Sequence, residues 1–374
     1  MGDDIFDDDK TDKTDKTDKT DKKVNKESEF CESIGVDIGT SSIVCSRKKK
    51  DGSFINKFHR NMLFPIDVSD EASDLLEKSN YNYIKVDKKY FIFGDDSISI
   101  CNAMGEKNDL ILRPMANGII NPNLKESSDL LFHIIKSVVG EPLVKGEKLR
   151  VSIPAQAINQ DIDNTFHKMV LLGLFREMGY DPKPVNEAMA IAYSENPISK
   201  DGDEITPLSG ISISCGAGQT NLALLFKGME LGSFSITKSG DYIDEQVAKA
   251  TGVPKSKIIK RKEKDFSLVN VDHKDKVLSA LSIYYAEYID RICHLMAQEF
   301  TKRGSEVSGS LEIVVGGGGS IVPGFIPMLE NSIKEQDFPF KILKIRHARN
   351  PFFAVSNGCL LRALSDTQKQ EKSK

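Results

Sequence analysis

Two glycine-rich turns, each set between two apolar strands, constrain this chain more than any other feature. The first is IGVDIGTSSIVC at residues 34–45, and the second is ISISCGAGQTNLAL at residues 211–224. Asp37 in the first turn corresponds to Ser214 in the second. Glycine lets the main chain approach a ligand closely and leaves backbone N–H groups open to it. Together with the GGGG run at residues 316–319, the turns predict a nucleotide held between two lobes.

Composition excludes several classes of protein. The 51 basic and 55 acidic residues give a net charge of -4, which argues against non-specific nucleic-acid binding. The six cysteines show no paired spacing, so we expect neither a zinc site nor a disulfide framework. No apolar run is long enough to span a membrane, and residues 1–30 lack the apolar core of a signal peptide. We therefore expect a soluble cytoplasmic protein without direct membrane insertion.

The N-terminal segment has a composition of its own. Residues 10–22 repeat Thr-Asp-Lys after an acidic start, and almost no apolar residue is present. Such a segment cannot bury enough surface to offset its ordering entropy, so residues 1–32 are predicted to be a disordered low-complexity tail. A solvated spacer is the simpler interpretation, and an adaptor protein that binds the tail is the alternative.

The rest of the chain repeats one plan. Each glycine turn is followed by a strand, a polar turn and another strand, and each copy takes half of the ordered chain. This predicts a duplicated α/β lobe rather than a short solenoid repeat. Apolar periodicity predicts helices at residues 127–139 and 162–178, and residues 150–154 form a short strand ended by proline. Ala190 and Gly358, in helices expected at 186–193 and 351–358, would let two helices cross closely and link the lobes.

The order of these motifs and elements along the chain resembles that of the superfamily of actins, sugar kinases and seventy-kilodalton heat-shock chaperones. Within this superfamily, the chain is most similar to bacterial actins of the MreB and MamK type. The first phosphate motif is similar to residues 36–40, the second to 214–220 and the adenosine motif to 315–320. RPMANGII at residues 113–120 resembles the Arg-Pro-x-x-x-Gly segment of MreB-like proteins. The resemblance covers residues 33–364.

The resemblance implies an α/β fold, the two-lobed actin-like ATPase fold built from duplicated RNase H-like lobes, with a nucleotide cleft between them. Lobe I is expected at residues 33–185 and 345–374, with a smaller subdomain at about 60–111. Lobe II is expected at residues 186–344, with a smaller subdomain at about 238–295.

The resemblance also implies which residues bind ATP or ADP and Mg²⁺. Magnesium prefers hard oxygen ligands and often keeps its waters, so Asp37 is the expected metal-side carboxylate, acting through water. The remaining nucleotide contacts are expected in the three glycine-rich motifs, in the Gly-Asp loop at 240–241 and in the charged run at 260–264. They are Gly39, Thr40, Ser41, Ser42, Ser214, Gly216, Ala217, Gly218, Gln219, Thr220, Gly240, Asp241, Lys260, Glu263, Gly316, Gly317, Gly318, Gly319 and Ser320.

Ser214 departs from the family pattern, because an aspartate usually stands at this position of the second motif. Ala217 also interrupts the glycine run that follows. A serine can hydrogen-bond a metal-bound water but carries no negative charge. The resemblance therefore implies weaker metal affinity or slower hydrolysis than in relatives with the aspartate.

Hydrolysis also needs a group that orients the attacking water and takes its proton. In the family this residue follows the strand-ending proline by about two helical turns. Counting from Pro154 reaches Asp161, which we expect to be catalytic. Gln160 and Asp163 are the nearby alternatives, and a capping role for Asp161 at the following helix stays open.

The expected function is that of a cytoskeletal ATPase that self-associates into filaments, because nucleotide-dependent closure of two lobes suits head-to-tail contacts that do not close into rings. Fold alone does not decide function, so two alternatives stay open. One is a non-polymerising nucleotide-dependent scaffold, suggested by Ser214 and Ala217. The other is a small-molecule kinase of the same superfamily.

Overall fold

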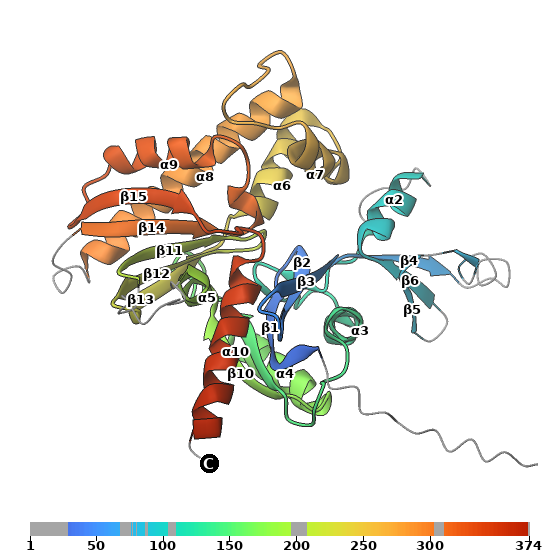
Figure 1. Cartoon of the computed structure of the whole chain (residues 1–374). Helices are drawn as coiled ribbons and strands as arrows, with labels where there is room; N and C mark the ends of the chain where they lie inside the picture. The colour runs from blue at the N-terminus through green and yellow to red at the C-terminus, as the bar shows by residue number, and fades with distance from the viewer. Residues whose placement is uncertain are drawn as a thin grey trace, which may run out of the picture.

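The computed structural model of the chain describes residues 29–67, 76, 78–79, 81–86, 89–103, 110–195, 208–302 and 310–372 (Figure 1). It is an α/β structure with two large sheets, each of which carries its own helices. The N-terminal tail expected at residues 1–32 lies outside the described residues up to residue 28, and its expected end is wrong, because strand β1 already begins at Phe30.

The first large sheet has the order β10-β9-β1-β2-β3. Its strands β1, β2 and β3 are antiparallel neighbours, while β9 and β10 continue the sheet in parallel with β1. Helices α3 and α4 share an apolar core with this sheet, and we call these elements lobe I. Their bounds are β1 (Phe30–Ile38), β2 (Ser42–Lys49), β3 (Phe54–Arg60), β9 (Lys148–Ile153), β10 (Asp181–Asn186), α3 (Ser127–Val139) and α4 (Thr165–Glu177).

The second large sheet repeats this plan in the order β13-β12-β11-β14-β15. Again three antiparallel strands are followed by two parallel ones, and a second core joins the sheet to its helices in what we call lobe II. The elements are β11 (Gly210–Cys215), β12 (Thr220–Phe226), β13 (Met229–Ile236), β14 (Ser310–Gly316), β15 (Lys341–His347), α6 (Gly240–Thr251), α7 (Lys255–Lys264), α8 (Lys276–Thr301), the short η3 (Gly318–Ser320) and α9 (Phe325–Lys334).

Smaller elements extend lobe I. A three-stranded sheet has the order β4-β6-β5, and helix α2 packs on it (Figure 1). A separate two-stranded hairpin, β7–β8, precedes α3. The bounds are β4 (Leu63–Asp67), β5 (Tyr83–Val86), β6 (Lys89–Phe93), α2 (Asp95–Ala103), β7 (Met115–Ala116) and β8 (Ile119–Ile120).

Two helices link the lobes, α5 (Glu187–Glu195) and α10 (Ala354–Lys372). They pack against each other, and Figure 1 shows α10 running between the two large sheets. A Cβ on Gly358 would lie 1.7 Å from the carbonyl oxygen of Ala190, and one on Gly35 of β1 would lie 2.1 Å from the carbonyl oxygen of Ser356. The close helix crossing predicted from Ala190 and Gly358 is therefore confirmed.

A second connection joins the lobes through the segment that follows β9. The Ile158 amide donates to the Ser235 carbonyl at 3.0 Å, and the Ser235 amide donates to the Gln156 carbonyl at 2.8 Å. This short piece of lobe I therefore pairs with the free edge of β13 in lobe II. None of the described helices is long and apolar enough to cross a membrane.

The helix crossing generates a stability prediction. Gly358→Ala should lower the free energy of unfolding by about 2–3 kcal/mol or more, because overpacking at a backbone contact forces the two helices apart. Gly173→Ala is the matched control. This glycine lies in α4 with open space where a Cβ would stand, so alanine should stabilise the protein by about 1 kcal/mol through helix propensity. Urea denaturation of both variants measures the difference, and equal effects would contradict the account.

Candidate nucleotide site between the lobes

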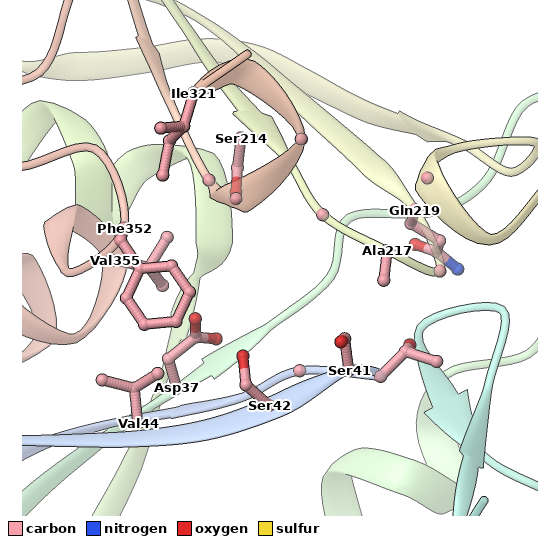
Figure 2. A pocket seen from close by; sticks show the side chains of 18 of the residues that line it. Asp37, Ser41, Ser42, Val44, Ser214, Ala217, Gln219, Ile321, Phe352 and Val355 are labelled. Atoms are coloured by element: carbon pink, nitrogen blue, oxygen red, sulfur yellow. The ribbon is translucent and has the colours of Figure 1, made fainter. Parts of the chain in front are cut away.

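A cavity of about 650 Å³ lies where the two lobes meet. Figure 2 shows Asp37, Ser41 and Ser42 of lobe I facing Ser214, Ala217 and Gln219 of lobe II across it. The cavity lies within the size range of small-molecule and cofactor sites. Its walls come from the β1–β2 turn, the β11–β12 turn, the loop around η3, helix α7, and the starts of α5 and α10.

The two turns are closed by equivalent backbone hydrogen bonds. The Gly39 amide donates to the Ser42 carbonyl at 2.9 Å, and the Gly216 amide donates to the Gln219 carbonyl at 3.0 Å. Within the described part of the chain, the next two amides of each turn donate no backbone hydrogen bond. These are the amides of Thr40, Ser41, Ala217 and Gly218. Such groups, gathered at two facing turns, form a concave site for anions.

The β7–β8 hairpin ties the two turns together. Its tip uses left-handed backbone at Asn117 and Gly118, with φ of 48° and 77°. The Gly118 amide donates to the Thr40 hydroxyl at 3.0 Å, and the Gln219 amide group donates to the Asn117 carbonyl at 2.6 Å. A Cβ on Gly218 would lie 2.4 Å from the Gly118 nitrogen, so there is no room for a larger residue. The hairpin therefore contacts both turns at once.

The hairpin is also held to lobe II by charge. Arg113, just before β7, donates from Nη1 to Oδ1 of Asp241 at 2.7 Å and from Nη2 to the Thr40 carbonyl at 3.3 Å. Burial alone would raise the pKa of Asp241, but the charges of Arg113 and Lys255 outweigh it and lower that pKa to about 2. Asp241 is thus an ionised anchor of the hairpin.

Two carboxylates lie at the floor of the cavity. Asp37 accepts a hydrogen bond from the Ser152 hydroxyl at 2.6 Å. Glu187, the first residue of α5, accepts from the Ser214 hydroxyl at 2.7 Å and from the Asn221 amide at 2.9 Å. Burial raises the pKa of both groups, and the charge of Asp37 raises that of Glu187 further, to about 8. The two groups titrate as a pair.

This pair fits a hard divalent cation. Among the described residues neither Asp37 nor Glu187 forms an ion pair with a lysine, arginine or histidine. Oxygen ligands of this kind suit Mg²⁺, which is held by one or two carboxylates and keeps several waters. The described residues contain no group of three or more His, Cys, Asp or Glu side chains that could hold a metal alone. Two carboxylates leave the remaining coordination positions of such an ion to water or to a bound phosphate.

Part of the cavity wall is apolar. Phe266, Tyr285, Ile321, Val322 and Pro323 of lobe II line it. Two charged residues of α7 border the same region. Lys262 donates to both carboxylate oxygens of Asp244 at 2.7 Å, and Glu263 contacts Arg60. Figure 2 also shows Phe352 beside Val355 and Ile321, close to Asp37.

Most of the nucleotide contacts predicted from the sequence line this one cavity. They are Asp37, Gly39, Thr40, Ser41, Ser42, Ser214, Gly216, Ala217, Gly218, Gln219, Gly240, Glu263, Gly317, Gly318 and Gly319.

The other predicted contacts are not among the residues that line the cavity. Thr220 is buried against Ser239 and Tyr288, and the Ser320 hydroxyl donates to the Gly317 carbonyl. Gly316 packs against Ile191 and Ala354 of the linking helices. Asp241 is engaged by Arg113 as described above. Lys260 is not among the lining residues, whereas Lys262, two positions later, is.

The structure does not bring Asp161 to the cavity. Its segment leaves lobe I along the edge of β13, and Asp161 lies beyond this pairing as an exposed residue just before α4. Gln160 and Asp163 are exposed as well, and Asp163 accepts a hydrogen bond from the Thr165 amide. Counting from Pro154 therefore leads to the surface, because the chain crosses to lobe II instead of turning back over the phosphate turns.

The residue at the floor that sequence reasoning missed is Glu187. The sequence places it in the helix at 186–193 only as part of a linking element. One signal could have identified it, because a carboxylate at the first turn of a helix next to a glycine-rich strand end can reach a site there. Arg60, Gly118 and Lys262 also line the cavity. Gly118 is the glycine of the Arg-Pro-x-x-x-Gly segment and Lys262 lies in the charged run at 260–264, but neither was predicted as a contact, and no local motif marks Arg60.

Comparisons with known proteins agree with this architecture. A family model described as Volactin matches residues 33–363. No curated protein matches the sequence.

Three solved structures show the fold at low sequence identity. The structure of a MamK double helical filament is 19% identical, covers 88% of this chain and 98% of its own, and has a TM-score of 0.63. MreB 5 of Spiroplasma citri bound to AMPPNP is 15% identical, covers 91% and 98%, and has a TM-score of 0.60. The ethanolamine utilization protein EutJ from Carboxydothermus hydrogenoformans is 13% identical, covers 88% and 89%, and has a TM-score of 0.52. The chain thus has the two-lobed actin-like fold.

The buried carboxylate of Glu187 generates a pH prediction. Its pKa is higher in the folded protein than in the unfolded chain, so its protonated form favours folding below about pH 4.5, and this contribution is lost as the pH rises toward 8. Glu187→Gln should therefore raise the free energy of unfolding at pH 8 by about 1–2 kcal/mol and have little effect at pH 5.

Urea denaturation of the nucleotide-free protein at several pH values measures this difference. Asp161→Asn, at an exposed position, is the control and should follow the wild type at every pH. The assignment is wrong if Glu187→Gln destabilises the protein equally at pH 5 and pH 8.

Proposed function

The chain belongs to the Volactin family, and we propose that it is an ATP-binding, actin-like cytoskeletal protein of the cytoplasm that assembles into filaments and hydrolyses ATP. The observation that carries the proposal is the pair of glycine turns closed by equivalent hydrogen bonds, facing each other across one cavity with Asp37 at its floor. The proposal keeps the expected division into lobe I at residues 33–185 and 345–374 and lobe II at residues 186–344, with two boundaries adjusted: β10 of lobe I ends at Asn186 and β15 of lobe II ends at His347.

A nucleoside triphosphate accounts for both the open amides and the apolar side chains that line the cavity. The open amides of Thr40, Ser41, Ala217 and Gly218 would hold the β- and γ-phosphates from both lobes. The wall formed by Phe266, Ile321 and Pro323 would receive the base. The similar MreB 5 structure has AMPPNP bound, which supports a nucleotide in this fold.

Asp37 would hold Mg²⁺ through water, and the cation would supply positive charge at the phosphates. Binding of a cation lowers the cost of ionising both Asp37 and Glu187, because opposite charge favours the carboxylate form. Ser152 orients Asp37 toward this task through its hydroxyl. The metal would therefore balance the negative charge of the Asp37 and Glu187 carboxylates.

Glu187 takes the catalytic role that the sequence assigned to Asp161. Ser214 and Asn221 fix its two oxygens, so the carboxylate is held in one orientation beside the turns. A pKa near neutrality suits a general base, because the group can then accept a proton from water and release it again. In this chain Glu187 would orient the attacking water and take its proton.

Ser214 would account for the slow ATP hydrolysis that the sequence predicts. Its hydroxyl is used by Glu187, so it adds no charge to the metal site. A third carboxylate at this position would face Asp37 and Glu187 in a desolvated space. The serine thus avoids repulsion with the Asp37 and Glu187 carboxylates, but it would bind the metal more weakly than an aspartate.

Filament assembly is supported by the fold and by one similar protein. The lobes are joined by few elements, so a nucleotide that contacts both turns favours one closed arrangement. Closed lobes present fixed surfaces for head-to-tail contacts, and such heterologous contacts produce open filaments. MamK, which shares the fold, was solved as a double helical filament. A non-polymerising scaffold remains the second candidate, favoured by the same Ser214 substitution.

The assembly test compares three proteins by light scattering, pelleting and phosphate release. The wild type should scatter and pellet with ATP and Mg²⁺ but not without nucleotide. Glu187→Gln should still assemble while its phosphate release falls by about a hundredfold or more, as expected for loss of a general base. Asp161→Asn should match the wild type in both.

Each failure has a separate meaning. ATP binding without scattering at high protein concentration would favour the scaffold. Slow phosphate release in Asp161→Asn, with normal release in Glu187→Gln, would return the catalytic role to Asp161.

Ser214→Asp tests the charge balance of the floor. The nucleotide-free variant should melt at a lower temperature than the wild type, because a third carboxylate joins Asp37 and Glu187. Adding Mg²⁺ with ADP should raise its melting temperature more than that of the wild type, because metal affinity rises with ligand charge. Ser214→Ala, which adds no charge, is the control for loss of the hydroxyl. An identical response of Ser214→Asp and Ser214→Ala to Mg²⁺ would contradict the role of charge.

A further inference from the structure

An arginine and a glutamate join the two lobes across the cavity. Arg60, the last residue of β3 in lobe I, donates from Nη1 to Oε1 of Glu263 at 3.0 Å and from Nη2 to Oε2 at 2.7 Å. Glu263 lies on α7 of lobe II, and both residues line the cavity. A bidentate pair of this kind fixes the relative orientation of its partners as well as their distance.

Lobe I holds Arg60 in place for this contact. Its Nε donates to the Asp95 carboxylate at the start of α2. Arg60 also stands opposite Ser42 in the β2–β3 register, directly beside the first phosphate turn. The guanidinium is therefore anchored on one side by its own lobe and presents its two terminal nitrogens to the other lobe.

The pair lies at the exposed edge of the cavity, whereas Asp37 and Glu187 form its floor. The Glu263 side chain is 45% exposed and that of Arg60 is 20% exposed. A pair in this position is weak enough to break and reform, because water competes for both partners. The ion pairs of Glu195 with Arg346 and Arg349 differ, because that carboxylate is only 3% exposed.

We propose that Arg60 and Glu263 form a latch that closes the edge of the nucleotide cavity and sets the rate at which nucleotide leaves. This inference rests on the proposed function, since it takes a nucleotide to be the occupant. The pair must break for the two lobes to separate at this edge. Its opening therefore precedes release, and salt, which screens exposed charges, speeds that opening.

The experiment measures release of a fluorescent N-methylanthraniloyl derivative of ATP, chased with excess unlabelled ATP, at a protein concentration below that of assembly. Four variants are compared with the wild type: Arg60→Ala, Glu263→Gln, the double variant, and Asp95→Asn as the matched control. Asp95→Asn removes the negative charge beside Arg60 within lobe I, while the asparagine Oδ1 can still accept the hydrogen bond from Nε, so Arg60 stays in place for the contact between lobes. Thermal melting of each variant checks that it is folded.

Arg60→Ala should speed release about three- to fivefold, the range expected for a partly exposed ion pair. Glu263→Gln should add no further acceleration in the Arg60→Ala background, because the latch is already broken. Asp95→Asn should stay within about twofold of the wild type. Raising KCl should speed release from the wild type more than from Arg60→Ala.

Two results overturn the latch while the proposed function stands. One is nucleotide binding by the wild type with equal release rates in Arg60→Ala. The other is a further acceleration by Glu263→Gln in the Arg60→Ala background, which would mean that Glu263 acts on the nucleotide directly. If the wild type binds no fluorescent nucleotide at all, the proposed function fails. Arg60→Lys, which keeps the charge but loses the second hydrogen bond, should lie between the wild type and Arg60→Ala.

Discussion

The backbone contact between the two linking helices is the constraint on which the rest of the molecule depends. At Gly358 the main chain of α10 approaches the Ala190 carbonyl so closely that no side chain fits between them. The same helix packs on β1 at Gly35, so one element fixes the first sheet against α5. Since β1 and β11 each end in a glycine turn, their packing on these helices brings the two turns face to face. Widening the crossing would separate the two halves of the cavity.

Electrostatics explains why the cavity would favour a bound ligand. Asp37 and Glu187 are desolvated, close enough to influence each other, and without a cationic partner among the described residues. Two such groups cannot both ionise cheaply in one site. A polyphosphate with its metal would satisfy the open amides of the turns and the charge of the floor together. The serine at position 214 then has a physical meaning, because it keeps the number of carboxylates at two and orients one of them.

Local patterns predicted the fold well because the relevant physics is local. Helical periodicity at 127–139 coincides with α3, and the repeated strand-turn-strand plan is seen in both sheets. The small residues at 190 and 358 predicted the helix crossing. The site was harder to predict, since Glu187 and Arg60 reach it through tertiary packing that no spacing rule describes. Asp161 shows most clearly where prediction from the sequence fails. Counting residues from Pro154 assumed that the chain stays next to the phosphate turns, whereas residues 156–158 pair with β13 and lead the chain away from them.

The central claim is that one nucleotide is held by both glycine turns and that this closes the lobes for assembly. Cryo-electron microscopy of the protein incubated with AMPPNP and Mg²⁺ tests it most directly. The account predicts filaments of head-to-tail subunits, with density for the triphosphate between residues 40–42 and 217–219 and metal density next to Asp37. Filaments with an empty cavity, or nucleotide density elsewhere on the subunit, would contradict it.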